Sequence, residues 1–167
     1  MKKQLVYLAT ILLLLTACSK KEPQNKDNID TAIRVIVKNE QGENLMDTLT
    51  PGAYRYETIQ IYWEVDGVWK KFYEPLFDHP KGFEVYTDWN PPMMFISESY
   101  IGTDTIPYPG TLIQWNENDA DTIRCEFRIT PYSISCTKVW VNGEPTWGSE
   151  GYEYNEYART IEIIRPD

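Results

Sequence analysis

The chain has 167 residues, of which 42% are hydrophobic and 14% are aromatic, a content that excludes a disordered chain and suits one folded domain. The formal net charge of −9 argues against a nucleic-acid partner, because binding to phosphates takes an excess of Lys and Arg. The single His excludes a metal cage built from several histidines and a mechanism that uses two, and we expect no cofactor.

The N-terminal segment predicts a signal peptide that ends at a cysteine. Two lysines precede an apolar run over residues 5–15, which is too short for a transmembrane helix of about 20 residues. The next residues, Leu15-Thr16-Ala17-Cys18, resemble the lipobox of bacterial lipoproteins, in which the cysteine is lipidated and becomes the N-terminus after cleavage. The resemblance implies a signal peptide over residues 1–17 and lipidation at Cys18. The alternative is a buried N-terminal helix with an incidental cysteine.

Residues 18–30 are predicted to form a flexible tether behind the lipid anchor, because a polar stretch in which Ile29 is the one apolar residue after Cys18 cannot build a core. Cleavage after residue 17 leaves 14 basic and 25 acidic residues, and so a net charge of −11. Ser19, not an acid, follows the cysteine. By resemblance to enterobacterial lipoproteins, this implies the outer membrane of the bacterial envelope, so the membrane is one expected partner.

Alternation with a period of two predicts β-strands over residues 31–167 and requires no helix. Within residues 58–65 the odd-numbered side chains are apolar and share one face, whereas the even-numbered side chains share the other. Asp66-Gly67 and Asn142-Gly143 are two-residue signals for primed hairpin turns. The expected strands cover residues 32–38, 59–65, 68–73, 83–86, 111–115, 121–129, 134–141 and 159–165.

Seven or eight short strands separated by Pro and Gly predict an all-β fold. The pattern favours an antiparallel β-sandwich of immunoglobulin-like or transthyretin-like type, with a small β-barrel as the alternative. Residues 31–167 are expected to form this fold as a single domain.

Two cysteines remain once Cys18 is assigned to the lipid. A hairpin centred between Thr130 and Pro131 would place Cys125 opposite Cys136, and an oxidising compartment would join them. We therefore predict a disulfide between them, with two buried thiols as the alternative. Cys136 reaches the core face of its strand only if a bulge intervenes, since it otherwise shares its face with Lys138.

Candidate catalytic groups are few. His79 follows Asp78, but adjacency in sequence is not geometry, and no nucleophile motif accompanies the pair. Paired carboxylates occur in any acidic domain and carry no signal without a cleft. The oxygen-rich segment 116–121 offers ligands for Ca²⁺ but lacks the spacing of an EF-hand, so a solvated turn is favoured and no metal ligand is assigned.

Aromatic side chains in loops are the candidate ligand-binding groups, because Trp and Tyr combine an apolar ring with a polar tip. Trp63 and Trp140 are expected in the core. The candidates for ligand binding are Trp89, Trp147, Tyr152 and Tyr154.

Asp-Thr followed by a small or aliphatic residue occurs four times and resembles the O-glycosylation sequon of secreted Bacteroidetes proteins. Thr31, beside the tether, is the candidate modified residue. The alternative is that Asp ends a turn and Thr opens a strand.

Together these segments resemble small envelope lipoproteins of the Bacteroidetes. The resemblance rests on Leu15–Cys18, on the strand IRVIV at 33–37 with the turn NEQGENLMD at 39–47, and on KVWVNGE at 138–144. It brings no catalytic residue. The first hypothesis is a membrane-anchored, non-catalytic binding or accessory module for a glycan or an envelope protein. The alternative is an envelope hydrolase that uses His79 or a carboxylate pair.

Overall fold

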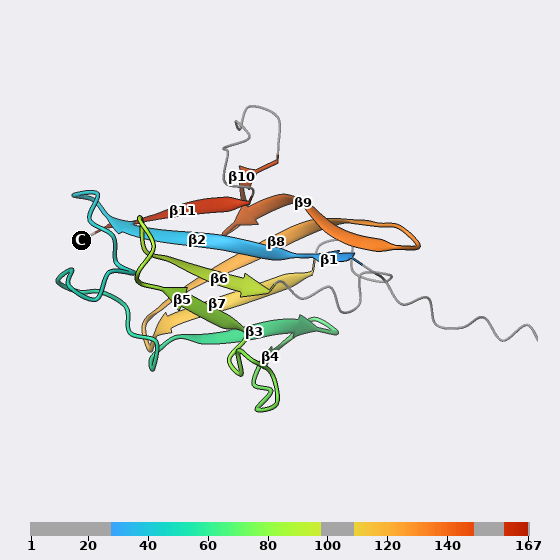
Figure 1. Ribbon diagram of the computed structural model, residues 1–167, viewed down its shortest axis with the longest axis horizontal. Helices are drawn as coiled ribbons and strands as arrows, with labels where there is room; N and C mark the ends of the chain where they lie inside the picture. The colour runs from blue at the N-terminus through green and yellow to red at the C-terminus, as the bar shows by residue number, and fades with distance from the viewer. Residues whose placement is uncertain (1–27, 98–108, 149–158, 167) are drawn as a thin grey trace, which may run out of the picture.

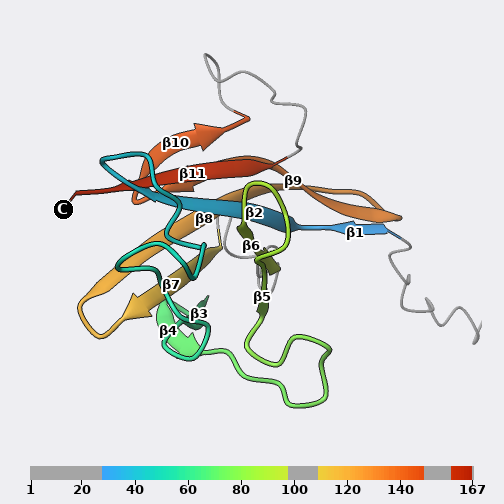
Figure 2. The ribbon, with the colours of Figure 1, turned by 60° about the vertical axis from the view of Figure 1, so that its left-hand side comes forward.

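Alternating apolar and polar residues form two β-sheets in the computed structural model, which describes residues 28–97, 109–148 and 159–166. The two sheets face each other across a common core (Figures 1 and 2). The described residues form strands, turns and loops, and they contain no helix long and apolar enough to span a membrane.

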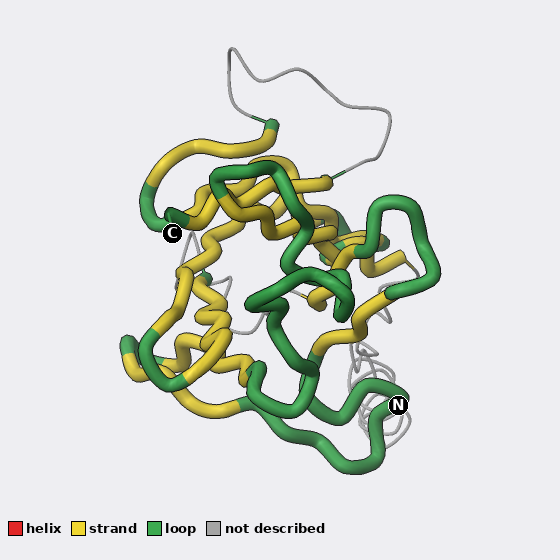
Figure 3. The backbone as a smooth tube through the Cα atoms, turned by 90° about the vertical axis from the view of Figure 1, so that its left-hand side faces the viewer, coloured by secondary structure: helices red, strands yellow, loops and turns green. Residues whose placement is uncertain are grey.

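The larger sheet has seven strands and curls around one side of the core like half of a barrel (Figure 3). Its main path follows the order β1-β9-β8-β7-β3-β4, and β10 also pairs with β9. The pair of β1 and β9 is parallel, whereas the other pairs are antiparallel. The strands are β1 (Asn28–Asp30), β3 (Gln60–Val65), β4 (Val68–Lys71), β7 (Gly110–Asn116), β8 (Asp119–Ile129), β9 (Ser133–Val141) and β10 (Glu144–Trp147).

The smaller sheet has four strands in the order β11-β2-β6-β5. The C-terminal strand lies parallel beside β2 (Figure 1), with Thr160 paired to Arg34 and Arg165 paired to Asn39. The other two pairs are antiparallel. The strands are β2 (Ala32–Asn39), β5 (Phe83–Tyr86), β6 (Met93–Ser97) and β11 (Thr160–Arg165).

The core lies between the sheets and is made from alternate residues of their strands, since successive side chains of a strand point to opposite faces. Burying these side chains contributes about 1.5–3 kcal/mol each for the large aliphatic and aromatic ones. The fully buried members include Ile33, Val35 and Val37 of β2, Ile61 of β3, Ile113 and Trp115 of β7, Ile123 and Cys125 of β8, and Ile161 of β11.

A polar cluster surrounds the buried carboxylate of Asp121. Trp115 donates its indole N–H to Asp121 over 2.7 Å, and the Asn142 amide donates to the other carboxylate oxygen of Asp121, also over 2.7 Å. Arg165 completes the cluster with an ion pair to Asp121. A buried carboxylate needs such partners, and these contacts tie the C-terminal strand to β7 and β8.

The predicted all-β fold is confirmed, and the two parallel pairs make both sheets mixed. Both predicted primed turns occur: φ is 54° and 73° at Asp66 and Gly67, and 52° and 88° at Asn142 and Gly143. The predicted strands all form, with ends that differ by one or a few residues.

Three strands escaped the sequence prediction: β1, β6 and β10. β1 falls on residues 28–30, so the last three residues of the predicted tether belong to the fold, where Asn28 donates to the Tyr132 carbonyl. The rest of the predicted tether, the predicted signal peptide and Cys18 lie outside the described residues.

The predicted disulfide is wrong, because Cys125 and Cys136 are not joined. Between the pairs Glu126–Lys138 and Phe127–Cys136, a bulge inserts Thr137 into β9. Cys125 therefore pairs with Val139, and the two cysteines are diagonal neighbours on the core face. Diagonal Cα atoms lie about 7–8 Å apart, beyond the reach of a disulfide.

The same bulge displaces Trp140 from the core. In a regular strand that buries Cys136, the even-numbered residues Lys138 and Trp140 would also face the core. The bulge shifts this alternation by one residue, so Val139 is buried and Trp140 lies half-buried on the opposite face. Trp63 packs against the core, as predicted.

Candidate functional site

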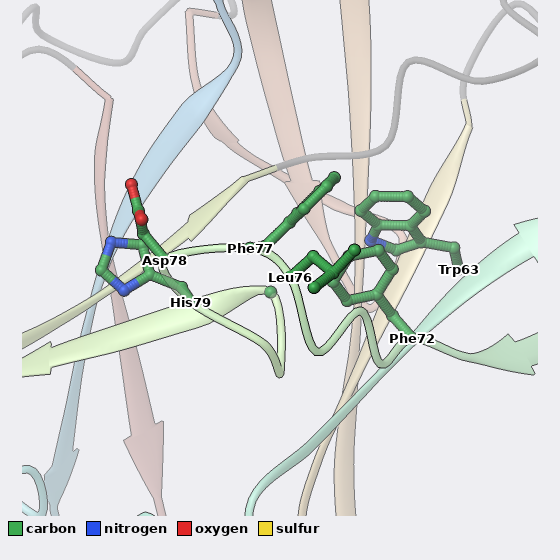
Figure 4. A pocket seen from close by; sticks show the side chains of 7 residues that line it. Trp63, Phe72, Leu76, Phe77, Asp78 and His79 are labelled. Carbon is green, nitrogen blue, oxygen red and sulfur yellow. The ribbon is translucent and has the colours of Figure 1, made fainter.

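An apolar hollow of about 400 Å³ lies beneath the loop that joins β4 and β5 (Figure 4). Its floor is the contact between Trp63 of β3 and Phe72, whose ring centroids lie 4.1 Å apart. Gly82 allows the loop to close over this floor, because a Cβ there would lie 2.8 Å from the Phe72 ring and its φ is +80°. The lining residues are Trp63, Phe72, Leu76, Phe77, Asp78, His79 and Gly82.

Hydrogen bonds hold this loop in shape. The Glu74 amide donates to the Pro80 carbonyl over 2.9 Å, and the Gly82 amide donates to the His79 carbonyl over 2.9 Å. The Lys81 ammonium donates to three backbone carbonyls of residues 56–59, and burial lowers its pKa. The loop therefore presents its outward side chains in a fixed arrangement.

Two of those side chains are large and apolar. Leu76 is 91% exposed, and Phe77 is also exposed at the rim of the hollow. Exposing such groups has a hydrophobic cost that burial against another molecule would remove. Trp63 adds a second cost, since its indole N–H is buried without a hydrogen-bond partner in the described part of the chain.

His79 stands at the polar end of the hollow, beside Asp78 (Figure 4). Its Nε2 lies 3.2 Å from a carboxylate oxygen of Glu84, and both side chains are partly exposed. The residues that line the hollow include no Ser, Thr or Cys. The structure thus brings His79 to an acid in a concave place, without a nucleophilic hydroxyl or thiol among the lining side chains.

Trp89 is 43% exposed and belongs to an aromatic cluster on the outer face of the smaller sheet. Its ring centroid lies 5.0 Å from that of Tyr86 and 5.5 Å from that of Phe95, and the Arg34 guanidinium lies over the Phe95 ring. The geometry is that of a platform, with one ring open to solvent.

Glu84 connects this platform to the hollow. Its carboxylate accepts a hydrogen bond from the Tyr86 phenol, which raises the pKa of Tyr86, and it also contacts His79. The hollow and the platform are therefore neighbours, and we call them together the aromatic surface. It comprises Trp63, Phe72, Leu76, Phe77, Asp78, His79, Glu84, Tyr86 and Trp89.

Two candidates from the sequence are buried. Trp147 is 5% exposed because its strand, β10, brings it into the core, so its prediction as a ligand-binding residue is wrong. Thr31 is also 5% exposed, because it lies between β1 and β2 inside the fold, and it is not accessible as a glycosylation site. Tyr152 and Tyr154 lie outside the described residues.

Two of the three acids in segment 116–121 have partners within the protein. Arg165 lies 3.3 Å from Asp119 and forms the ion pair with Asp121, and the Tyr54 hydroxyl donates to Asp119. Burial, and then the hydrogen bond to Asp119, raise the pKa of Tyr54 to about 12. Within residues 28–97, 109–148 and 159–166, no three His, Cys, Asp or Glu side chains are grouped to hold a metal ion.

No protein-family model, no curated protein and no solved structure matches this chain.

Proposed function

We propose that the protein is a lipoprotein of the bacterial outer membrane and a non-catalytic binding or accessory module for an envelope protein. The attachment rests on the lipobox-like Leu15–Cys18 and on the polar stretch behind it. The binding role rests on one observation: Leu76 and Phe77 are large apolar side chains exposed at the rim of a preformed hollow.

The chemistry of this surface favours a protein over other ligands. Aromatic side chains in and around desolvated pockets contribute much of protein–protein binding energy, and Phe77 offers such an anchor, with Leu76 as an apolar neighbour. Asp78 makes no hydrogen bond or ion pair with another described residue, so its charge is left for a basic group. The fitting partner segment presents an apolar side chain next to Lys or Arg.

Two equally exposed leucines allow a matched test. Leu49 is 89% exposed in the loop between β2 and β3 and does not line the hollow, whereas Leu76 is 91% exposed at its rim. Full-length protein in detergent, with a photo-crosslinker in place of Tyr73, an exposed residue of the same loop that does not line the hollow, is incubated with solubilised envelope. We expect one crosslinked partner with the parent and with Leu49→Asp, and a loss of about tenfold or more with Leu76→Asp. Equal crosslinking by the two leucine variants would contradict the proposal.

The lipid anchor has its own test. Cys18→Ala removes the thiol that would carry the lipid, so we expect an unprocessed precursor that incorporates no labelled fatty acid. Incorporation by this variant at the parent level would rule out the lipobox interpretation.

A hydrolase is the second candidate, favoured by the contact between His79 and Glu84 within reach of a hollow. It predicts turnover of ester, peptide or glycoside substrates that disappears in His79→Ala. The binding-module proposal instead expects no turnover by the parent, and partner capture that persists in His79→Ala.

A further inference from the structure

A second concave region lies on the opposite face of β3. It is a groove of about 680 Å³ over the outer face of the larger sheet, where β3 lies between β7 and β4 (Figure 1). The volume falls within the range of about 300–1,000 Å³ typical of small-molecule sites. The lining residues are Thr58, Gln60, Tyr62, Lys71, Gln114, Asn116, Glu117 and Asn118.

Strand alternation and register bring these side chains together. On β3 the buried Ile61 turns inward, so Gln60 and Tyr62 turn outward. Gln60 pairs directly with Gln114 of β7, and Tyr62 pairs with Lys71 of β4. The turn between β7 and β8, residues 116–119, forms one end of the groove.

Part of the groove is fixed in advance. The Tyr62 hydroxyl donates to the Gln114 side-chain carbonyl over 3.0 Å, which leaves the Gln114 NH₂ group available. Asn116 accepts from the Asn118 backbone amide over 2.8 Å and so shapes the turn. Within the described part of the chain, neither the Gln60 nor the Asn118 side-chain amide has a hydrogen-bond partner.

The donor and acceptor inventory defines the ligand. Each side-chain amide offers two donors and one acceptor, a mixture that matches hydroxyl groups, which both donate and accept. The Tyr62 ring adds one apolar face for stacking. Lys71 and Glu117 contribute one charge of each sign, so the groove attracts neither a polyanion nor a polycation.

We infer that this groove binds a neutral oligosaccharide, whose hydroxyl groups bond the amides and whose C–H face lies on Tyr62. This groove is separate from the aromatic surface, because Tyr62 and Trp63 lie on opposite faces of β3. This sugar site also differs from one in which a glycan would stack on Trp89, because Trp89 packs against the smaller sheet.

The test measures binding of neutral tetrasaccharides of glucose, mannose and xylose to the full-length protein in a detergent without a sugar headgroup. A uronic-acid tetrasaccharide serves as the charged counterpart. We expect at least one neutral sugar to bind, and Tyr62→Ala and Asn118→Ala each to weaken it about tenfold. Asn118 is exposed in a turn, so its variant keeps the fold. Tyr132→Ala, which removes an exposed tyrosine elsewhere, should bind like the parent.

Three results would overturn the inference: no binding of any neutral sugar, tighter binding of the uronic acid, or unchanged affinity in both groove variants. If only Trp89→Ala lost sugar binding, the sugar would bind at the aromatic platform and not in the groove, which would also overturn the inference. None of these results bears on partner crosslinking by Leu76→Asp.

Discussion

The two faces of β3 present opposite chemistry within one strand. Trp63 forms the floor of an apolar hollow, and its neighbour Tyr62 lies in a groove rich in amides. The hollow depends on a loop that folds over the edge of the core, whereas the groove depends on the register of three paired strands. Alternation along one strand can thus supply two sites suited to different ligand classes, a protein segment and a sugar.

The largest expected effect comes from the buried carboxylate behind the groove. Asp121→Asn removes the charge that Arg165 pairs with and disrupts the acceptor for Trp115, whose neighbours in β7 line the groove. We expect the free energy of unfolding to fall by about 3 kcal/mol, measured by denaturant titration. Asp88→Asn, at an exposed loop position, should stay within about 0.5 kcal/mol of the parent. Equal stabilities of the two variants would refute this role for Asp121.

A pair of alanine substitutions compares the two faces directly. Trp63→Ala removes a ring packed on the core and on Phe72, so it should lower the free energy of unfolding by about 2 kcal/mol. Tyr62→Ala removes a side chain from the outer face and should cost less than about 1 kcal/mol. If the two variants unfold at the same denaturant concentration, the predicted difference in stability between the two faces of β3 is wrong.

High pH should act on the end of the groove through Tyr54, which donates to Asp119 of the adjoining turn. Its pKa is raised in the fold to about 12 from an ordinary value of about 10. The protonated phenol is favoured by folding, so this stabilisation is complete below pH 10 and is lost as the pH rises towards 12. The slope of unfolding free energy against pH over this window should flatten in Tyr54→Phe. An unchanged slope would show that Tyr54 does not carry the effect.

The smallest expected effect is that of a reductant. Because Cys125 and Cys136 are not joined, dithiothreitol should leave the unfolding midpoint unchanged. A disulfide between them would contribute about 2–4 kcal/mol, so a clear drop in the midpoint would contradict the observed pairing of β8 and β9.

The strands could be predicted from sequence because their signals are local. Alternation identified both faces of β3, and Asp66-Gly67 and Asn142-Gly143 located two turns. The sequence indicated that Cys136 reaches the core face only if a bulge intervenes, but it did not locate that bulge at Thr137, because the position of a bulge depends on how two strands pair. The bulge turns Trp140, which was expected in the core, to the opposite face.

The candidate sites could be predicted from the sequence less well than the strands. The sequence identified Trp89 as an exposed aromatic residue. It did not predict that Trp147 and Thr31 are buried, because their burial depends on strands that the sequence pattern did not reveal. The hollow joins Trp63 to a loop some ten to twenty residues later, and the groove joins Gln60 to Gln114. Such juxtapositions follow from the topology of the sheets.

One experiment with two ligands tests whether the two faces of β3 are separate sites. Leu76→Asp and Asn118→Ala are each measured for partner crosslinking and for binding of the neutral tetrasaccharide. We expect Leu76→Asp to lose only the protein partner and Asn118→Ala to lose only the sugar. A variant that loses both ligands while still folded, or two variants that lose neither, would contradict this expectation.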